Sequence, residues 1–244
     1  MTLLREKRYL SFGEAVFCVL ALVVLALVLR KIAPYLYDNL FTYPLVTIFL
    51  LGTISLAVVK IKKLDPGYLF RSSKYDRSIG PFLCITISFF LLSRIALDVE
   101  DLLRLGSANF FKTRGEWIYN LSSRKGIHFI TIVAVAPVME EILFRGVFLR
   151  SFLTRYSIGH AVVLSSLLFA ILHTDASGSY FSGFLSSLLS GAFFALVLVR
   201  TDSLKLAIVC HVFWNLLNYI LPLLVILLDG RVHTMNNLIA LEAT

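Results

Sequence analysis

The sequence predicts an all-α fold, a polytopic transmembrane helical bundle that crosses the membrane about seven times. Two observations support this prediction. Of the 244 residues, 58% are hydrophobic and only 16% are charged, whereas a soluble domain of this length needs more polar surface to cover its core. The apolar residues also form long runs of about 20, the length that spans the hydrocarbon as a helix. The alternation typical of membrane barrel strands is absent.

Seven apolar runs are candidate spans. They cover residues 12–33, 41–59, 79–97, 127–152, 157–173, 181–199 and 204–228. Proline lacks a backbone N–H and interrupts helices, so Pro222 could divide the last run and raise the count to eight. Within the first run, Arg30 and Lys31 follow the apolar stretch from Ala15 to Leu29, where a signal peptide would carry small residues, so we interpret this run as a retained span.

The net charge of +8 does not indicate a nucleic-acid partner, because the basic residues lie mainly between the apolar runs and no nucleic-acid motif is present. The segment 60–77 combines basic residues with an Asp-Pro-Gly turn, which is typical of a cytoplasmic loop. We therefore expect this segment and the basic N-terminus to lie on the same, cytoplasmic side of an integral multi-pass protein.

The polar residues at membrane depth are concentrated in the second half of the chain. We expect a single membrane domain over residues 1–244, in which 1–126 supply accessory spans and a polar loop and 127–228 form a catalytic helical core. An ionisable residue near the middle of a spanning helix costs about 2.5–3.5 kcal/mol on insertion scales. A helix that retains several such residues is therefore expected to use them.

The run 134–149, AVAPVMEEILFRGVFL, holds two carboxylates and an arginine. A helix advances about 100° per residue, which places Glu141 and Arg145 on one face and turns Glu140 away from both. Glu141 can then pair with Arg145, so that each offsets the desolvation of the other. Glu140 is left to face a cavity, where it could act as a general base. A structural ion network near a helix end would use the same residues.

Two further motifs place histidines on later helices. Phe169 and His173 are four residues apart, so the phenyl ring can pack over the imidazole, and His211 and Asn215 offer two donors on one helix face. Taken alone, His173 could be an interface residue at the end of a span, and helix-to-helix hydrogen bonding could explain His211 and Asn215. Together with a carboxylate they supply a base, a group that orients water, and an oxyanion stabiliser. These are the parts needed to hydrolyse an amide with water as the nucleophile.

The ordered set of motifs resembles the CAAX protease and bacteriocin-processing family. The set is Glu-Glu-x-x-x-Arg at 140–145, Phe-x-x-x-His at 169–173 and His-x-x-x-Asn at 211–215. Members of this family are intramembrane glutamic endopeptidases, and they include the type II CAAX prenyl endopeptidases. The resemblance covers roughly residues 127–220, and it does not extend to the first three apolar runs.

The resemblance implies that Glu140 and His173 activate a water while His211 and Asn215 hold the oxyanion. It implies supporting roles for Glu141, Arg145 and Phe169. We therefore expect a peptide-bond hydrolase that needs no cofactor and no metal. Its expected substrate is a membrane-associated peptide or protein, prenylated or otherwise lipid-anchored, in the bilayer of a prokaryotic cytoplasmic membrane. An endoplasmic reticulum location would fit a eukaryotic member.

Three other functions could use the same residues. Two histidines and a glutamate could ligate zinc in a zinc-dependent membrane protease, although the His-Glu-x-x-His pairing is missing and asparagine is an uncommon zinc ligand. Buried glutamate, histidine and arginine also mark a transporter or a proton relay, although the chain has no internal repeat. A non-catalytic scaffold could use these side chains for packing.

The predicted spans place the candidate catalytic residues at different depths in the membrane. Simple alternation from a cytoplasmic N-terminus places His173 near the external end of its span, whereas Glu140 and His211 lie closer to the cytoplasmic side. A shared cavity requires similar depth. Either one of the boundaries is wrong or a helix is broken, and Pro137 is the candidate for such a break.

Overall fold

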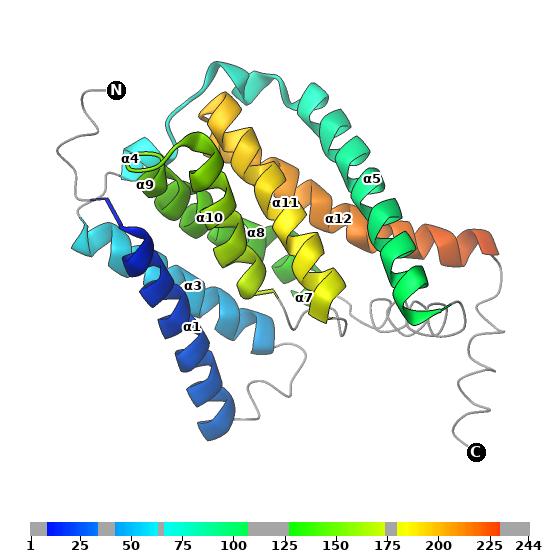
Figure 1. The fold of residues 1–244 in the computed structure, drawn as a ribbon, viewed down its shortest axis with the longest axis horizontal. Helices are drawn as coiled ribbons and strands as arrows, with labels where there is room; N and C mark the ends of the chain where they lie inside the picture. Colours follow the sequence, from blue (N-terminus) through cyan, green and yellow to red (C-terminus); the bar gives the residue numbers. More distant parts are fainter. Residues whose placement is uncertain (1–8, 34–41, 63–65, 107–126, 174–179, 230–244) are drawn as a thin grey trace.

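The computed structural model describes residues 9–33, 42–62, 66–106, 127–173 and 180–229, and the ordered elements within these ranges are all helical (Figure 1). The first half contains α1 (Phe12–Ile32), α3 (Thr42–Ile61), the short α4 (Pro66–Leu69), the 3₁₀ turn η2 (Lys74–Arg77) and α5 (Ile79–Leu105). The second half ends with α10 (Ile158–Ile171), α11 (Tyr180–Thr201) and α12 (Leu204–Asp229).

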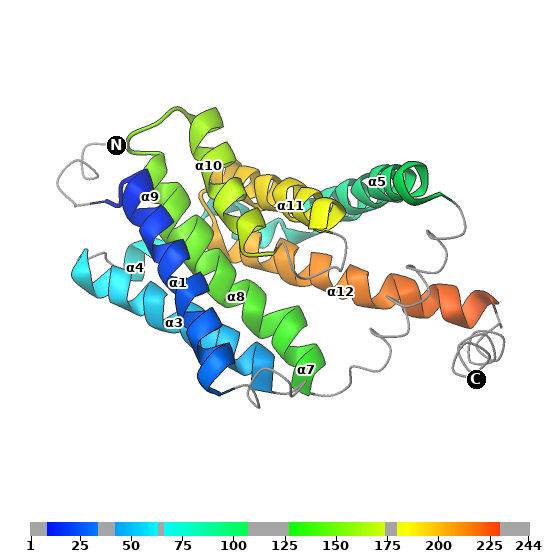
Figure 2. The ribbon, with the colours of Figure 1, turned by 60° about the horizontal axis from the view of Figure 1, so that its bottom comes forward.

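Between these halves, one continuous helical segment alternates between α and π geometry. It comprises α7 (Ile127–Ile130), the π segment η3 (Thr131–Val135), α8 (Ala136–Glu141), the π segment η4 (Ile142–Leu149) and α9 (Arg150–Phe152). This central helix contacts α3, α10, α11 and α12, so it forms the middle of the bundle. In Figure 2, α7, α8 and α9 follow one line.

The predicted helical class is confirmed, and all seven predicted runs fall on helical segments. Four of these are long and apolar enough to cross a membrane, with windows at Phe12–Leu29, Ile79–Val99, Gly183–Thr201 and Leu204–Leu221. The division of the last run is wrong, because α12 continues unbroken through Pro222. Membrane helices tolerate proline when local adjustment satisfies the freed backbone groups.

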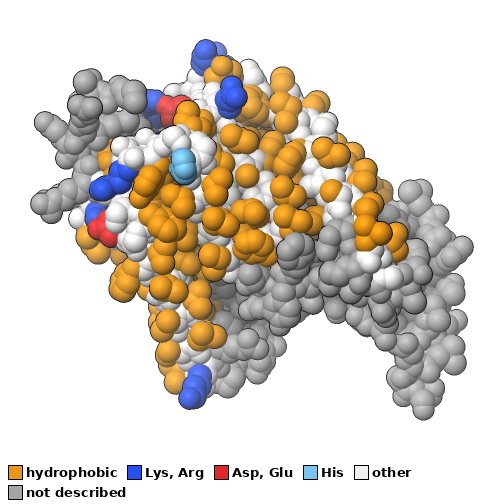
Figure 3. Space-filling model, in the orientation of Figure 1, with side chains coloured by type: hydrophobic (Ala, Val, Ile, Leu, Met, Phe, Trp, Pro, Cys, Tyr) orange, Lys and Arg blue, Asp and Glu red, His pale blue; other side chains and the backbone are white. Residues whose placement is uncertain are grey.

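The surface agrees with a location in the bilayer. Large hydrophobic side chains are exposed along α1 and α5, as Phe17 at 72% and Leu103 at 80% illustrate. Figure 3 shows hydrophobic side chains over most of the described surface on one face, with few charged groups among them. Such an extended apolar surface is unfavourable in water and favourable against lipid. The protein is therefore an integral membrane protein.

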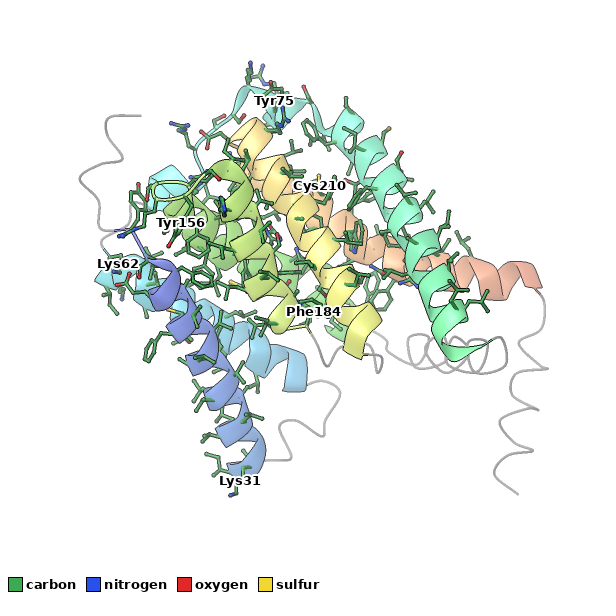
Figure 4. All side chains as sticks on the ribbon, in the orientation of Figure 1. Lys31, Lys62, Tyr75, Tyr156, Phe184 and Cys210 are labelled. Atoms are coloured by element: carbon green, nitrogen blue, oxygen red, sulfur yellow. The ribbon has the colours of Figure 1, made fainter. Side chains whose placement is uncertain are left out.

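One end of the bundle gathers the polar connections. The Ser73 hydroxyl donates to the Thr201 carbonyl at 2.5 Å, which ties η2 to the α11–α12 turn. Asp202 in that turn pairs with Arg71 and with Arg150. Figure 4 labels Lys62, Tyr75 and Tyr156 at this end, with Lys31 at the far end of α1.

The N-terminal segment joins the same end, because Arg155 donates to the Tyr9 carbonyl at 3.1 Å. The described residues of loop 60–77 and Tyr9 thus lie at the same end of the bundle, whereas the basic residues of the N-terminus, to which the prediction referred, lie outside the described residues. That this side is cytoplasmic remains a prediction.

The expected difference in depth between His173 and Glu140 arises from α10, which is too short to cross a membrane. Its 14 residues extend about 21 Å at 1.5 Å per residue. On the same scale, His173 lies about 22 Å beyond Ile158 and Glu140 about 18 Å before Phe152. The two residues therefore reach similar depth without a break at Pro137. The prediction that His173 lies near the external end of a full span is wrong.

Candidate active site

Glu140 lies where three segments of the bundle meet. Its side chain is 12% exposed at the end of α8, and its Oε1 atom lies 3.7 Å from the His173 Nε2 atom just beyond α10. Its Oε2 atom lies 3.6 Å from the His211 Nε2 atom on α12. The structure thus brings together three of the four residues that the sequence analysis named as catalytic.

The His173 ring is oriented by its own helix. Its Nδ1 atom lies 2.8 Å from the Phe169 carbonyl oxygen, which can only accept a hydrogen bond, so Nδ1 carries the proton and Nε2 faces Glu140. The Phe169 ring stacks on the imidazole with centroids 4.2 Å apart. This is the contact that the four-residue spacing predicted.

The His211 ring is oriented from a different helix. Its Nδ1 atom lies 2.8 Å from Glu141 Oε1, and a carboxylate accepts, so Nδ1 donates and Nε2 faces Glu140. The Phe194 ring of α11 stacks on this imidazole with centroids 4.4 Å apart. Both histidines therefore present the same ring nitrogen to Glu140.

Glu141 and Arg145 form the buried pair that their spacing predicted. Both side chains are 0% exposed, and Arg145 Nη1 lies 3.0 Å from Glu141 Oε1. The same oxygen also accepts from His211, a contact across helices that the helical spacing did not predict. Adjacent carboxylates thus approach opposite nitrogens of one imidazole ring.

Arg145 makes a second set of contacts, with α10 and α11, which the sequence analysis missed. Its Nη2 atom donates to the Gly191 carbonyl at 2.8 Å, and its guanidinium carbon lies 4.6 Å from the Phe169 ring centroid and 5.6 Å from that of Phe194. A Cβ at position 191 would lie 3.2 Å from Phe169 Cδ1 and 3.4 Å from Arg145 Nη2. A glycine inside a helix often marks such a close approach, so Gly191 was the available signal.

Asn215 lies one turn beyond His211 on α12 and bonds to the central helix. Its Nδ2 atom donates to the Ile132 carbonyl oxygen at 3.0 Å, in the π segment η3. The sequence analysis paired this amide with His211 as an oxyanion donor. Among the described residues, no group of three or more His, Cys, Asp or Glu side chains has an arrangement that could hold a metal ion.

One family model matches the central part of the chain. Residues 123–217 match the family model described as type II CAAX prenyl endopeptidase Rce1-like. This segment of the chain is therefore similar to the CAAX protease family. The resemblance drawn from the motifs is thereby confirmed, and every site residue named above lies within the matched segment. A family of endopeptidases implies a hydrolase that cleaves peptide bonds. No curated protein and no solved structure matches the chain.

Proposed function

We propose that this protein is a glutamic-type intramembrane endopeptidase that hydrolyses a peptide bond of a membrane-associated or lipid-modified protein or peptide. The observation that carries the proposal is the position of Glu140 between two Nε2 atoms, at 3.7 and 3.6 Å. These separations are too long for direct hydrogen bonds. Both nitrogens therefore retain the capacity to share a water with the carboxylate.

In the proposed reaction, Glu140 is the general base. It takes a proton from a water that His173 Nε2 helps to orient, and the water oxygen forms a bond with the scissile carbonyl carbon. The carbonyl oxygen becomes an oxyanion. When the carbon–nitrogen bond breaks, Glu140 returns the proton to the leaving amine. The cycle consumes one water and needs no cofactor or metal.

His211 is the proposed donor to the oxyanion. Its Nδ1 proton already goes to Glu141, so the ring offers an Nε2 proton only when both nitrogens are protonated. The Glu141 carboxylate at 2.8 Å stabilises that charged form, and Arg145 fixes the carboxylate in place. The resemblance implies a second donor in Asn215. The amide has two N–H groups, and the bond to Ile132 uses one of them for a further role, which is argued below.

The burial of the site supports a substrate that comes from the membrane. The side chain of His173 is 27% exposed, whereas those of Glu140 and His211 are 12% and 4% exposed. Glu140 and His173 lie about 18–22 Å along their helices from one end of the bundle. We propose a prenylated or otherwise lipid-anchored peptide as the substrate and a prokaryotic cytoplasmic membrane as the location.

A cleavage assay in proteoliposomes tests the proposal. The substrates are matched membrane-associated peptides with and without a prenyl group, and the variants are Glu140→Ala, His173→Ala and His211→Ala. We expect near-complete loss for the first two and a large loss for the third. The control is Glu14→Gln, a carboxylate on α1 that pairs with Lys62 and is expected to be dispensable. Normal cleavage by a folded Glu140→Ala variant would refute the proposed mechanism.

Metal analysis of the same preparation separates this mechanism from a zinc-dependent one. We expect activity to survive a strong chelator, because water activation is assigned to the side chains alone. Stoichiometric zinc, with activity lost on chelation and restored by the metal, would replace the proposed mechanism by metal-assisted hydrolysis.

A further inference from the structure

The Ile132 carbonyl has lost both of the donors that a regular helix would supply. In an α-helix it would accept from Ala136, but the Ala136 N–H donates to the Thr131 carbonyl, one residue further back. In a continued π segment it would accept from residue 137, which is a proline and has no N–H. Asn215 Nδ2 supplies the missing hydrogen bond from α12 at 3.0 Å.

This bond matters because a helical backbone has no water to compensate it inside a membrane. An unsatisfied carbonyl at membrane depth costs several kcal/mol in hydrocarbon. A second contact holds the same region, since the Phe129 and Tyr219 rings pack edge to face at 5.1 Å. Tyr219 follows Asn215 by four residues, so both lie on one face of α12.

The π segment also sets the direction of the catalytic carboxylate. A π bulge adds a residue to the turn, and each residue of a helix rotates the following side chains by about 100°. If η3 relaxed to regular α geometry, the residues that follow it, Glu140 among them, would turn by that angle. Glu140 would then no longer face His173 and His211.

We propose that Asn215 is a positioning residue: by replacing the hydrogen bond that Pro137 cannot donate, it holds the π geometry of η3 and thereby aims Glu140 at the two histidines. The proposal rests on the catalytic role assigned to Glu140 above. It makes Pro137 and Asn215 a functional pair, because the asparagine is needed only where the proline has removed the backbone donor.

A double-mutant cycle between positions 137 and 215 tests this pairing. Asn215→Leu keeps the approximate shape of the side chain and removes its donor, whereas Pro137→Ala restores a backbone N–H. The matched control is Asn218→Leu, since Asn218 Nδ2 donates to the Trp214 carbonyl of its own helix at 3.1 Å. For each variant, kcat and KM are measured in proteoliposomes, together with the midpoint of reversible unfolding in mixed micelles.

Asn215→Leu is expected to lower kcat about tenfold to a hundredfold, the effect of a small displacement of a catalytic group, with KM within about twofold of the original. In the Pro137→Ala background, the same change should lower the logarithm of kcat by less than half as much. It should also shift the midpoint of unfolding by less than half as much. Asn218→Leu should behave like the unmodified protein.

The outcomes separate the positioning role from a direct one. If Asn215→Leu has the same effect on kcat and on the midpoint in both backgrounds, the pairing is refuted and Asn215 acts at the oxyanion. If Pro137→Ala itself abolishes cleavage, the midpoint cycle decides, because it needs no activity. If the unmodified protein cleaves no peptide, the proposed function fails, while the midpoint cycle still confirms or refutes the pairing.

Discussion

Arg145→Met is expected to be among the most destabilising single changes in the bundle. It removes the guanidinium from a site where the pair with Glu141 is 0% exposed on both sides, and it leaves the carboxylate buried without its cation. Breaking a buried pair in this way typically costs about 3–5 kcal/mol. The donated bond to the Gly191 carbonyl is lost as well.

The double variant Glu141→Gln with Arg145→Met should be far more stable than the sum of its parts. Two independent losses would total about 6–10 kcal/mol, whereas replacing both charges by neutral groups of similar volume is often close to neutral. The lost hydrogen bond to Gly191 and the weakened one from His211 account for about 2 kcal/mol. The coupling energy is therefore expected to exceed about 4 kcal/mol, above the roughly 0.5–3 kcal/mol of most contacting groups, because each single variant leaves a buried charge unpaired.

Equilibrium unfolding in mixed micelles, followed by circular dichroism, measures these free energies. A loss below about 1 kcal/mol for Arg145→Met, or a double variant equal to the sum of the single ones, would refute the assignment of a tightly coupled buried pair. Cleavage gives a second readout. The double variant should fold but cleave poorly, because the proposed mechanism requires a carboxylate at position 141 beside His211 Nδ1.

Three further predictions concern groups around the site and at the polar end of the bundle. The Ser203 hydroxyl, with backbone and side-chain donors nearby, holds the pKa of Asp76 below its ordinary value. The stability that the Asp76 carboxylate contributes is full above about pH 4 and is lost as pH falls through the lowered pKa. Asp76→Asn should therefore flatten the acid limb of a stability titration, and an unchanged limb would contradict this. Phe194→Leu removes the ring stacked on His211 and should lower kcat about tenfold. Phe193→Leu, the same loss one residue earlier, should leave kcat within about twofold of the original. Equal effects of the two variants would indicate that Phe194 acts through packing alone. Asp202 has φ 52°, a conformation that asparagine tolerates better than alanine. Thermal unfolding should therefore show Asp202→Ala to be about 1–2 kcal/mol less stable than Asp202→Asn. Equal midpoints would count against backbone strain at this turn.

The sequence predicted the contacts that lie within one helix. The pair of Glu141 with Arg145 and the stacking of Phe169 on His173 follow from the four-residue spacing alone, because neighbours on a helix face are fixed by 3.6 residues per turn. The approximate bounds of the helices followed from hydropathy, which reports the length of each apolar run. These features are local, and a local pattern is sufficient to predict them.

The contacts between helices could not be derived from spacing. Spacing does not predict that Glu141 reaches His211, and although Gly191 marks a close approach, it does not say that Arg145 is the side chain that lies against it, since both contacts depend on the packing of distant segments. Hydropathy also failed for α10, because it does not distinguish a half-span from a full span and so put His173 at the wrong depth. The π segments were missed for a related reason: hydropathy carries no information on which carbonyl a backbone N–H reaches.

The geometry explains why the two carboxylates are consecutive in the chain. The His211 ring lies between them, with Nδ1 at 2.8 Å from Glu141 and Nε2 at 3.6 Å from Glu140. Side chains about 100° apart on one helix can approach opposite nitrogens of a ring held on another helix. Carboxylates four residues apart would share one face and could not. The rotation of the central helix, and not only its depth, therefore determines whether Glu140 and Glu141 can both reach the His211 ring.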